Sequence, residues 1–255
     1  MTSSIDLNVD LGESYGPWVM GHDAEMLDIV TSANVACGFH AGDPQVMDKT
    51  IRMCQAKGVG IGAHPGFRDL HGFGRYEIQG IPHDVLSRDI IYQIGAIQAM
   101  ARVNGAHVRH VKLHGAFANM ASRDKALADM YVEAARAVDP DLYVVAMAST
   151  ALEKATLEQG GNIAREVFAD RAYNDDGTLV SRSVPGSVIH DADMAADRVL
   201  KMIDDQAVTS INGVRTPVKP ETICVHGDNP AAVAMASALR NRLEKAGIAV
   251  KMFGS

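Results

Sequence analysis

Acidic, amide and histidine side chains recur at the ends of short apolar runs along this 255-residue chain. The first run ends in Asn8, Asp10 and Glu13, and the second is followed by His40 and Asp43. Later runs end in a further set of polar residues, namely His64, Lys112, His114, Asp170, Arg171 and His226. Side chains of these types act as general acids and bases, stabilise developing negative charge or bind divalent cations.

Three kinds of chemistry fit this set. A carboxylate such as Asp10 can act as a general base on water while histidines and Lys112 stabilise negative charge. Aspartate with several histidines can bind zinc or another divalent ion. Arg75, in Gly72-Phe-Gly-Arg, can hold a carboxylate or phosphate together with the amides of the neighbouring glycines.

Several familiar motifs are absent from the sequence. No His-Glu-x-x-His or Cys-x-x-Cys pair fixes metal-ligand geometry. A divalent metal therefore stays an open alternative, and we predict that the chain purified alone holds no stoichiometric transition metal. There is no Gly-x-x-x-x-Gly-Lys-[Ser/Thr] phosphate loop, so the chain is not predicted to hydrolyse ATP unaided. The Gly-x-Ser-x-Gly elbow of serine hydrolases is missing as well.

Composition excludes several partners. The net charge of −7 provides no basic surface for nucleic acid or an anionic membrane. The start of the chain lacks the pattern of a signal peptide, and no apolar run approaches the roughly 20 residues of a membrane span. Three irregularly spaced cysteines in apolar runs indicate buried free thiols in a reducing compartment. We therefore expect a cytoplasmic protein.

Alternating short apolar runs and amphipathic segments must position these side chains. The runs predict seven strands, at Ile5–Val9, Val30–Ala36, Val59–Ala63, His107–Leu113, Leu142–Ala148, Ile163–Phe168 and Thr222–Val225. Repeated β-then-α units imply a parallel sheet with right-handed crossovers. The sequence thus predicts an α/β fold, a seven-stranded parallel β/α barrel in a single domain over residues 1–255. An open doubly wound sheet is the alternative.

Helices are expected between the strands. An apolar stripe predicts one that Gly105 ends, with the stripe at Val85, Ile90, Ile94, Ile97 and Met100. Two others are predicted at Ala192–Ile203 and Ala231–Ala246. The stretch Ala172–Ser187 is predicted to be an excursion or hairpin.

In a parallel barrel the carboxyl ends of all strands meet at one face, where active sites lie. Six of the seven predicted strands deliver ionisable residues to that face, so we predict a catalytic or binding site there. The remaining histidines divide into two groups. His22, His83, His107 and His190 are expected at caps or on the surface, whereas His71 and His110 stay unassigned.

The same segments resemble one family, the lactam-utilisation or YcsF-like (LamB/YcsF) proteins. The matching stretches run in order from Asp6 to about Ala232: Asp6-Leu-Asn-Val-Asp-Leu-Gly-Glu, Ala33–Pro44, Gly62–Arg75, Val111–Asn119, Glu166-Val-Phe-Ala-Asp-Arg-Ala-Tyr and Val225-His-Gly-Asp-Asn-Pro. The resemblance implies a barrel of the glycoside hydrolase and deacetylase type. It also implies an ATP-dependent 5-oxoprolinase activity that requires partner subunits B and C. The ATP-binding site would lie mainly on these partners.

On that resemblance, Asp10, His64, His114 and Lys112 are the expected catalytic residues. Asp10 would orient or deprotonate water, His64 and His114 would stabilise or protonate departing groups, and Lys112 would offset negative charge. The expected substrate-binding residues are Asn8, Glu13, His40, Asp43, Arg75, Asp170, Arg171 and His226.

Two other functions stay open. The first is a metal-dependent, deacetylase-like hydrolase of an acylated carbohydrate, with Asp10, His40 and His64 as ligands. The second is a non-catalytic subunit that only binds the lactam.

Overall fold

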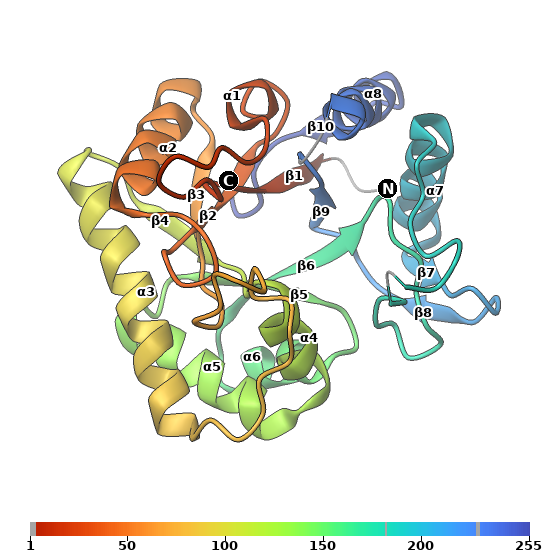
Figure 1. The fold of residues 1–255 in the computed structure, drawn as a ribbon. Coiled ribbons are helices and arrows are strands. Elements are labelled where there is room, and N and C mark those ends of the chain that lie inside the picture. Colours follow the sequence, from red (N-terminus) through yellow and green to blue (C-terminus); the bar gives the residue numbers. More distant parts are fainter. Residues whose placement is uncertain (1–3, 182, 228–229) are drawn as a thin grey trace.

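The computed structural model describes residues 4–181, 183–227 and 230–255. Over these residues seven parallel strands close into a barrel surrounded by helices (Figure 1). In spatial order the strands are β1 (Ser4–Leu11), β2 (Ser32–Ala36), β3 (Gly60–His64), β4 (Val108–Val111), β5 (Tyr143–Met147), β6 (Asn162–Phe168) and β9 (Thr222–Val225). Pairing of β9 with β1 completes the ring. Each strand overlaps a predicted run, so the barrel is confirmed and the open sheet is excluded.

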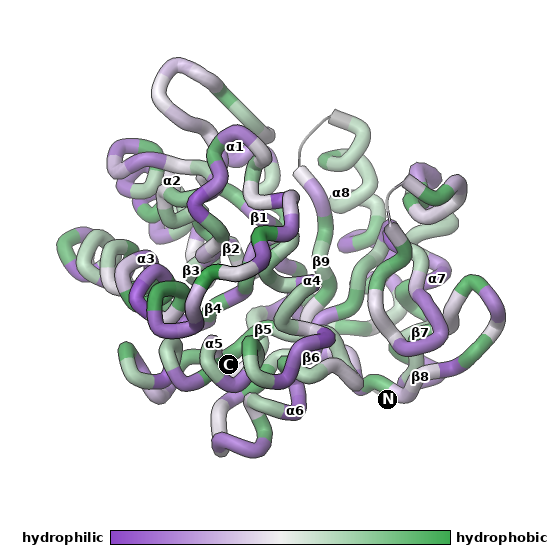
Figure 2. Tube along the Cα trace, turned by 60° about the horizontal axis from the view of Figure 1, so that its bottom comes forward, coloured by the Kyte–Doolittle hydropathy of each residue, from purple (hydrophilic) through white to green (hydrophobic). Residues whose placement is uncertain are grey.

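The outer helices each bury one face against the barrel. They are α1 (Asp23–Met26), α2 (Pro44–Lys57), α3 (His83–Val103), α4 (Gly115–Arg123), α5 (Lys125–Val138), α6 (Ala151–Glu158), α7 (Ala192–Asp205) and α8 (Pro230–Lys245). Along α2 and α3 hydrophobic and hydrophilic residues alternate, as expected of half-buried helices (Figure 2). The three helices predicted by position are confirmed.

The apolar stripe of α3 differs at its two ends from the prediction. Its buried positions include Leu86, Ile90, Ile94, Ile97 and Ala101. Val85 is exposed instead, because a spacing of five residues to Ile90 carries its side chain well round the helix. At the other end, Ala101 is buried and Met100 only partly so.

Three further strands were not predicted, because they are too short to show periodicity. Strands β7 (Ala207–Thr209) and β8 (Arg215–Pro217) form an antiparallel hairpin, and β10 (Ala249–Val250) pairs with the start of β1. The excursion over Ala172–Ser187 is confirmed by its isolated antiparallel bridges, Arg171 to Val188 and Tyr173 to Leu179. The three cysteines are free and buried, as predicted. Within the described residues, no helix combines the length and the apolar character that a membrane crossing requires.

The inside of the barrel is polar, although barrels of this kind are usually filled with branched apolar side chains. Alternation along β1 turns Asp6, Asn8 and Asp10 inward. Near the amino ends of the strands, the Asp6 carboxylate accepts hydrogen bonds from the hydroxyls of Thr31 and Ser32, at 2.7 Å each, and from that of Thr222. We call these four residues the lower layer. Burial outweighs the three hydroxyl donors and raises the pKa of Asp6 to about 6.

Candidate active site

A charged centre lies above the lower layer, toward the carboxyl ends of the strands. The ammonium of Lys112 pairs with Glu166 Oε1 at 2.7 Å and with Asp10 Oδ1 at 3.2 Å, and donates to Asn8 Oδ1 at 3.1 Å. The Nδ2 of Asn34 donates to Asn8 and Asp10, at 2.8 Å each. Lys112 and Glu166 are buried, whereas the side chain of Asp10 is 27% exposed. The Asp10 carboxylate is thus held by Lys112 and Asn34 inside the barrel and is partly exposed toward the carboxyl ends of the strands.

The charges in this centre stabilise one another. Burial opposes ionisation of Asp10, but His64 and Lys112 outweigh it and hold the pKa of Asp10 well below its ordinary value. Burial likewise opposes the charge of Lys112, while Asp10, Cys224 and Glu166 raise its pKa well above the ordinary value. Asp10 is therefore ionised throughout the physiological range, and Lys112 is its counter-ion.

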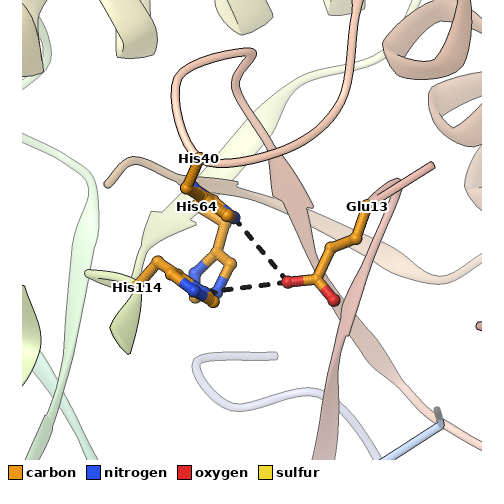
Figure 3. Close-up of side chains that lie close together, drawn as sticks. All are labelled: Glu13, His40, His64 and His114. Atoms are coloured by element: carbon orange, nitrogen blue, oxygen red, sulfur yellow. Dashed lines mark hydrogen bonds and ion pairs between the residues drawn. The ribbon is translucent and has the colours of Figure 1, made fainter. Parts of the chain in front are cut away.

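A second group, which we call the rim cluster, comprises Glu13, His40, His64 and His114. These residues come from the carboxyl ends of four neighbouring strands, β1 to β4, and their side chains point toward one another (Figure 3). The Oε1 of Glu13 lies 3.7 Å from His40 Nε2 and 3.7 Å from His114 Nδ1. His114 Nδ1 lies 3.0 Å from His64 Nε2. One candidate ligand atom from each residue falls within 4.8 Å of the others.

Backbone carbonyls fix the tautomers of two of these histidines. His64 Nδ1 lies 2.8 Å from the carbonyl of Lys112, and His114 Nε2 lies 2.8 Å from that of Phe73. A carbonyl only accepts, so each of these nitrogens carries the proton and donates. In neutral rings, His64 Nε2 and His114 Nδ1 are then bare lone pairs that face each other. Phe73 lies in the left-handed region with φ 54°, a strained conformation for this residue.

Burial disfavours the charged form of three members of the rim cluster, Glu13, His40 and His114. It lowers the pKa of His114 to about 3 and that of His40 well below its ordinary value. It also raises the pKa of Glu13 to about 8, aided by the nearby charge of Asp10. The ring planes of His40 and His114 stack in parallel with centroids 3.8 Å apart, an arrangement that two imidazolium ions would not tolerate.

Two glycines make room for histidine rings, one for His110 inside the barrel and one for the rim cluster. A Cβ on Gly62 would lie 2.0 Å from His110 Nε2, so only glycine leaves space for that ring. Gly74 has φ +61°, and a Cβ there would approach both His40 and His114 within 3 Å. The loop that follows β3 therefore lies directly against the cluster.

The remaining predicted residues lie elsewhere on the rim. Asp170 Oδ2 pairs with His226 Nδ1 at 2.6 Å, after β6 and β9, and Arg171 donates to the carbonyl of Val180. Asp43 is the N-cap of α2: its Oδ1 accepts from two helix amides and its Oδ2 from Gly16 N. The guanidinium of Arg75 is exposed and lies over the ring of Phe73, 5.0 Å from its centroid.

Contacts among the described residues thus connect some of the predicted site residues with one another and leave others apart from them. Asn8, Asp10, Lys112 and the rim cluster form one connected group. Asp170 and His226 form another pair.

The sequence did not indicate three participants. Glu166 is the closest partner of Lys112, Asn34 links Asn8 to Asp10, and His110 Nε2 bonds Asn34 Oδ1 at 2.7 Å. Alternation from Phe168 back to Glu166 places both on one strand face, and that signal could have identified Glu166. His22 and the three other histidines expected at surface positions are at least partly exposed.

Known proteins share this sequence and fold. The model of the LamB/YcsF family matches residues 5–255. A relative from Ruegeria pomeroyi, named as the A subunit of 5-oxoprolinase, is 52% identical over 249 residues, 98% of each chain. The crystal structure of the lactam utilization protein from Thermus thermophilus superposes with a TM-score of 0.92 at 42% identity, covering 98% of this chain and 100% of that one.

A more distant structure shares the fold alone. The catalytic domain of a peptidoglycan N-acetylglucosamine deacetylase from Eubacterium rectale is 9% identical, with a TM-score of 0.52 over 100% of this chain and 90% of that one. The deacetylase-type barrel implied by the resemblance is thereby confirmed. With a family match over nearly the whole sequence and a relative at 52% identity, the chain belongs to the LamB/YcsF family.

Proposed function

We propose that this chain is the A subunit of an ATP-dependent 5-oxoprolinase, which opens the lactam of 5-oxo-L-proline to give L-glutamate. The name of the relative at 52% identity supports the reaction. The observation that carries the chemistry is the Asp10 carboxylate, which is ionised, partly exposed and held by Lys112 and Asn34 at the open end of the barrel.

The reaction needs activation before water can attack. An amide carbon is a poor electrophile, and hydrolysis of an unstrained five-membered lactam is unfavourable without coupling. Transfer of a phosphoryl group from ATP to the lactam oxygen makes the carbon electrophilic. Water then adds to that carbon, the carbon–nitrogen bond breaks, and the ring nitrogen takes a proton. A second water releases phosphate from the acyl phosphate, leaving glutamate.

In this scheme Asp10 positions the attacking water. Its depressed pKa makes it a weak base, so its main contribution is to accept a hydrogen bond and orient the oxygen. Lys112 keeps Asp10 ionised and offsets negative charge as water adds. The carbonyl-bound tautomers leave His64 and His114 as acceptors, so these rings are poorly placed to protonate the departing nitrogen when neutral.

The substrate carboxylate needs a cation at the mouth of the barrel. Arg75 offers an exposed guanidinium at the rim, and its positive charge lowers the pKa of Glu13 against the effects of burial and Asp10, which places it near the rim cluster. A guanidinium binds a carboxylate through two parallel hydrogen bonds. Arg75 is therefore proposed to hold the substrate carboxylate.

We propose that ATP is bound mainly by the partner subunits B and C, because this chain has no phosphate loop. The test is reconstitution. The chain alone should neither hydrolyse ATP nor open 5-oxoproline, whereas the mixture with both partners and ATP should produce glutamate. Asp10→Asn should lower glutamate formation about 10²–10⁴-fold, because it removes the negative charge and one of the two oxygens that can orient the water. Phosphate release should fall less, since an activated lactam that escapes decays in water.

The matched control is Asp191→Asn, which changes another aspartate to asparagine at the N-cap of α7, where asparagine also caps well. It should leave both products unchanged. Unchanged glutamate output from Asp10→Asn would remove Asp10 from the reaction. Equal losses of phosphate and glutamate would show that this chain acts during phosphorylation or before it. Hydrolysis of amide substrates by the isolated chain would favour the deacetylase-like alternative.

A further inference from the structure

The rim cluster brings together buried polar atoms that lack matching partners. His64 Nε2 and His114 Nδ1, both lone pairs in the neutral tautomers, lie 3.0 Å apart, and Asp10 Oδ2 lies 3.3 Å from His64 Nε2. Among the described residues, Glu13 Oε1 and both ring nitrogens of His40 have no hydrogen-bond partner. His40 is 1% exposed, so solvent does not satisfy it. Buried polar atoms without partners at such density are costly unless a ligand sits among them.

A proton alone does not resolve this arrangement. A proton on His64 Nε2 could be donated to His114 or Asp10. Glu13 Oε1 would still lie 3.7 Å from His40 Nε2 and 3.7 Å from His114 Nδ1, too far for a hydrogen bond whichever atom carries the proton. Placing a second proton on His40 would put charge into a ring stacked on His114 at 3.8 Å. One multivalent cation, in contrast, satisfies all four residues at once.

The spacing fits such an ion. Ligand atoms at about 2.1 Å from a shared metal lie about 3.4 Å from one another in a tetrahedron and up to about 4.2 Å apart across an octahedron. The nearest distances in the cluster, 3.0, 3.7 and 3.7 Å, lie on either side of the tetrahedral value. The widest separation, within 4.8 Å, needs only a small contraction.

From this geometry we infer that Glu13, His40, His64 and His114 form a binding site for one divalent transition-metal ion. Three imidazoles and one carboxylate suit Zn²⁺, Co²⁺ or Mn²⁺ and are a poor ligand set for Mg²⁺ or Ca²⁺. The carbonyls that fix the His64 and His114 tautomers are the outer partners that metal-bound histidines normally have. This inference reverses the expectation of a metal-free chain, which the lack of a ligand pair at fixed sequence spacing had suggested.

The site is distinct from the Asp10–Lys112 centre but adjoins it, because His64 contacts both groups. Asp10 is a neighbour of the site, not one of its four ligands. The ligand set also differs from that of the deacetylase-like alternative, which used Asp10, His40 and His64. The inference is independent of the proposed lactam chemistry, since metal binding is measured without substrate.

The test uses the untagged full-length chain, stripped with EDTA and titrated with Co²⁺ and Zn²⁺. Calorimetry should show one ion bound per chain with a dissociation constant below about 1 μM, and Co²⁺ should develop visible d–d absorption bands typical of nitrogen and oxygen ligands. Zn²⁺ should raise the melting temperature, because it binds the folded state. Mg²⁺ should do none of these.

Two variants locate the site. Glu13→Gln and His40→Gln should weaken Co²⁺ binding at least about 100-fold and change its absorption spectrum, while His83→Gln, an exposed histidine at the start of α3, should not. Glu13 is at the solvent-facing side of the cluster, so its variant should fold even if His40→Gln does not; circular dichroism checks this. Absence of saturable binding in the wild-type chain would overturn the inference. So would wild-type affinity in the folded Glu13→Gln variant.

Discussion

The lower layer and the rim cluster are two buried polar groups in one barrel, and they are built on opposite principles. In the lower layer the acceptor, Asp6, meets three hydroxyl donors, from Thr31, Ser32 and Thr222. In the rim cluster the lone pairs of His64 and His114 face each other, and Glu13 Oε1 and both ring nitrogens of His40 have no hydrogen-bond partner among the described residues. Both groups are mostly buried, with one partly exposed member each, so burial does not distinguish them. Hydrogen-bond complementarity does: the lower layer is complete in itself, whereas the rim cluster is complete only with a ligand.

Removal of Lys112, which sits between the two groups, should have the largest effect on stability. Lys112→Met keeps most of the volume but leaves Asp10 and Glu166 as two uncompensated carboxylates, so we expect the free energy of unfolding to fall by about 3–5 kcal/mol. Urea titration of the metal-free chain measures it. Adding Glu166→Gln to Lys112→Met removes one of these charges and should restore part of the loss. A single variant as stable as wild type would show that the centre contributes nothing to folding.

The pH dependence of the free energy of unfolding tests the lower layer, because it reports the protonation state of Asp6. The pKa of Asp6, raised to about 6 in the fold from 3.8, makes the folded state retain a proton that the unfolded chain has already lost. Stability from this group is thus full below about pH 4 and declines as pH rises through about 6. Asp6→Asn cannot lose that proton. Between about pH 4.5 and about pH 7.5 its free energy of unfolding should therefore gain about 2 kcal/mol relative to wild type.

Chemical denaturation of both proteins at several pH values provides the comparison. Other titrating groups, Glu13 among them, are common to the two proteins and cancel in the difference. A difference that is constant with pH would mean that Asp6 is ionised in the fold throughout this range.

The sequence predicted the barrel and its polar rim because both depend on local patterns. Alternation placed Asn8 and Asp10 on one strand face, and strand ends located the histidines. Complementarity could not be predicted, because it depends on contacts between distant segments: Thr222 meets Asp6 across 216 residues, and Asn8 meets Lys112 across 104. The metal-ligand geometry could not be predicted from the sequence for the same reason. Its four ligands come from four strand ends and share no fixed spacing along the chain.

The most direct test compares one variant from each of the two groups in a paired measurement. Glu13→Gln changes the rim cluster and Ser32→Ala changes the lower layer, where Ser32 Oγ donates to Asp6 at 2.7 Å. Both the free energy of unfolding of the metal-free chain and the rate of glutamate formation in the reconstituted complex are measured for each variant.

For Ser32→Ala we predict a loss of about 1–3 kcal/mol of stability, because a buried acceptor loses a donor, with glutamate formation per folded molecule within about twofold of wild type. For Glu13→Gln we predict stability within about 1 kcal/mol. We predict glutamate formation reduced at least about 10²-fold, because Glu13 lies beside Asp10 and is expected to position the substrate. The reverse pattern, a destabilised but active Glu13→Gln beside a stable but inactive Ser32→Ala, would contradict the assignment of a structural role to the lower layer and a ligand-binding role to the rim cluster.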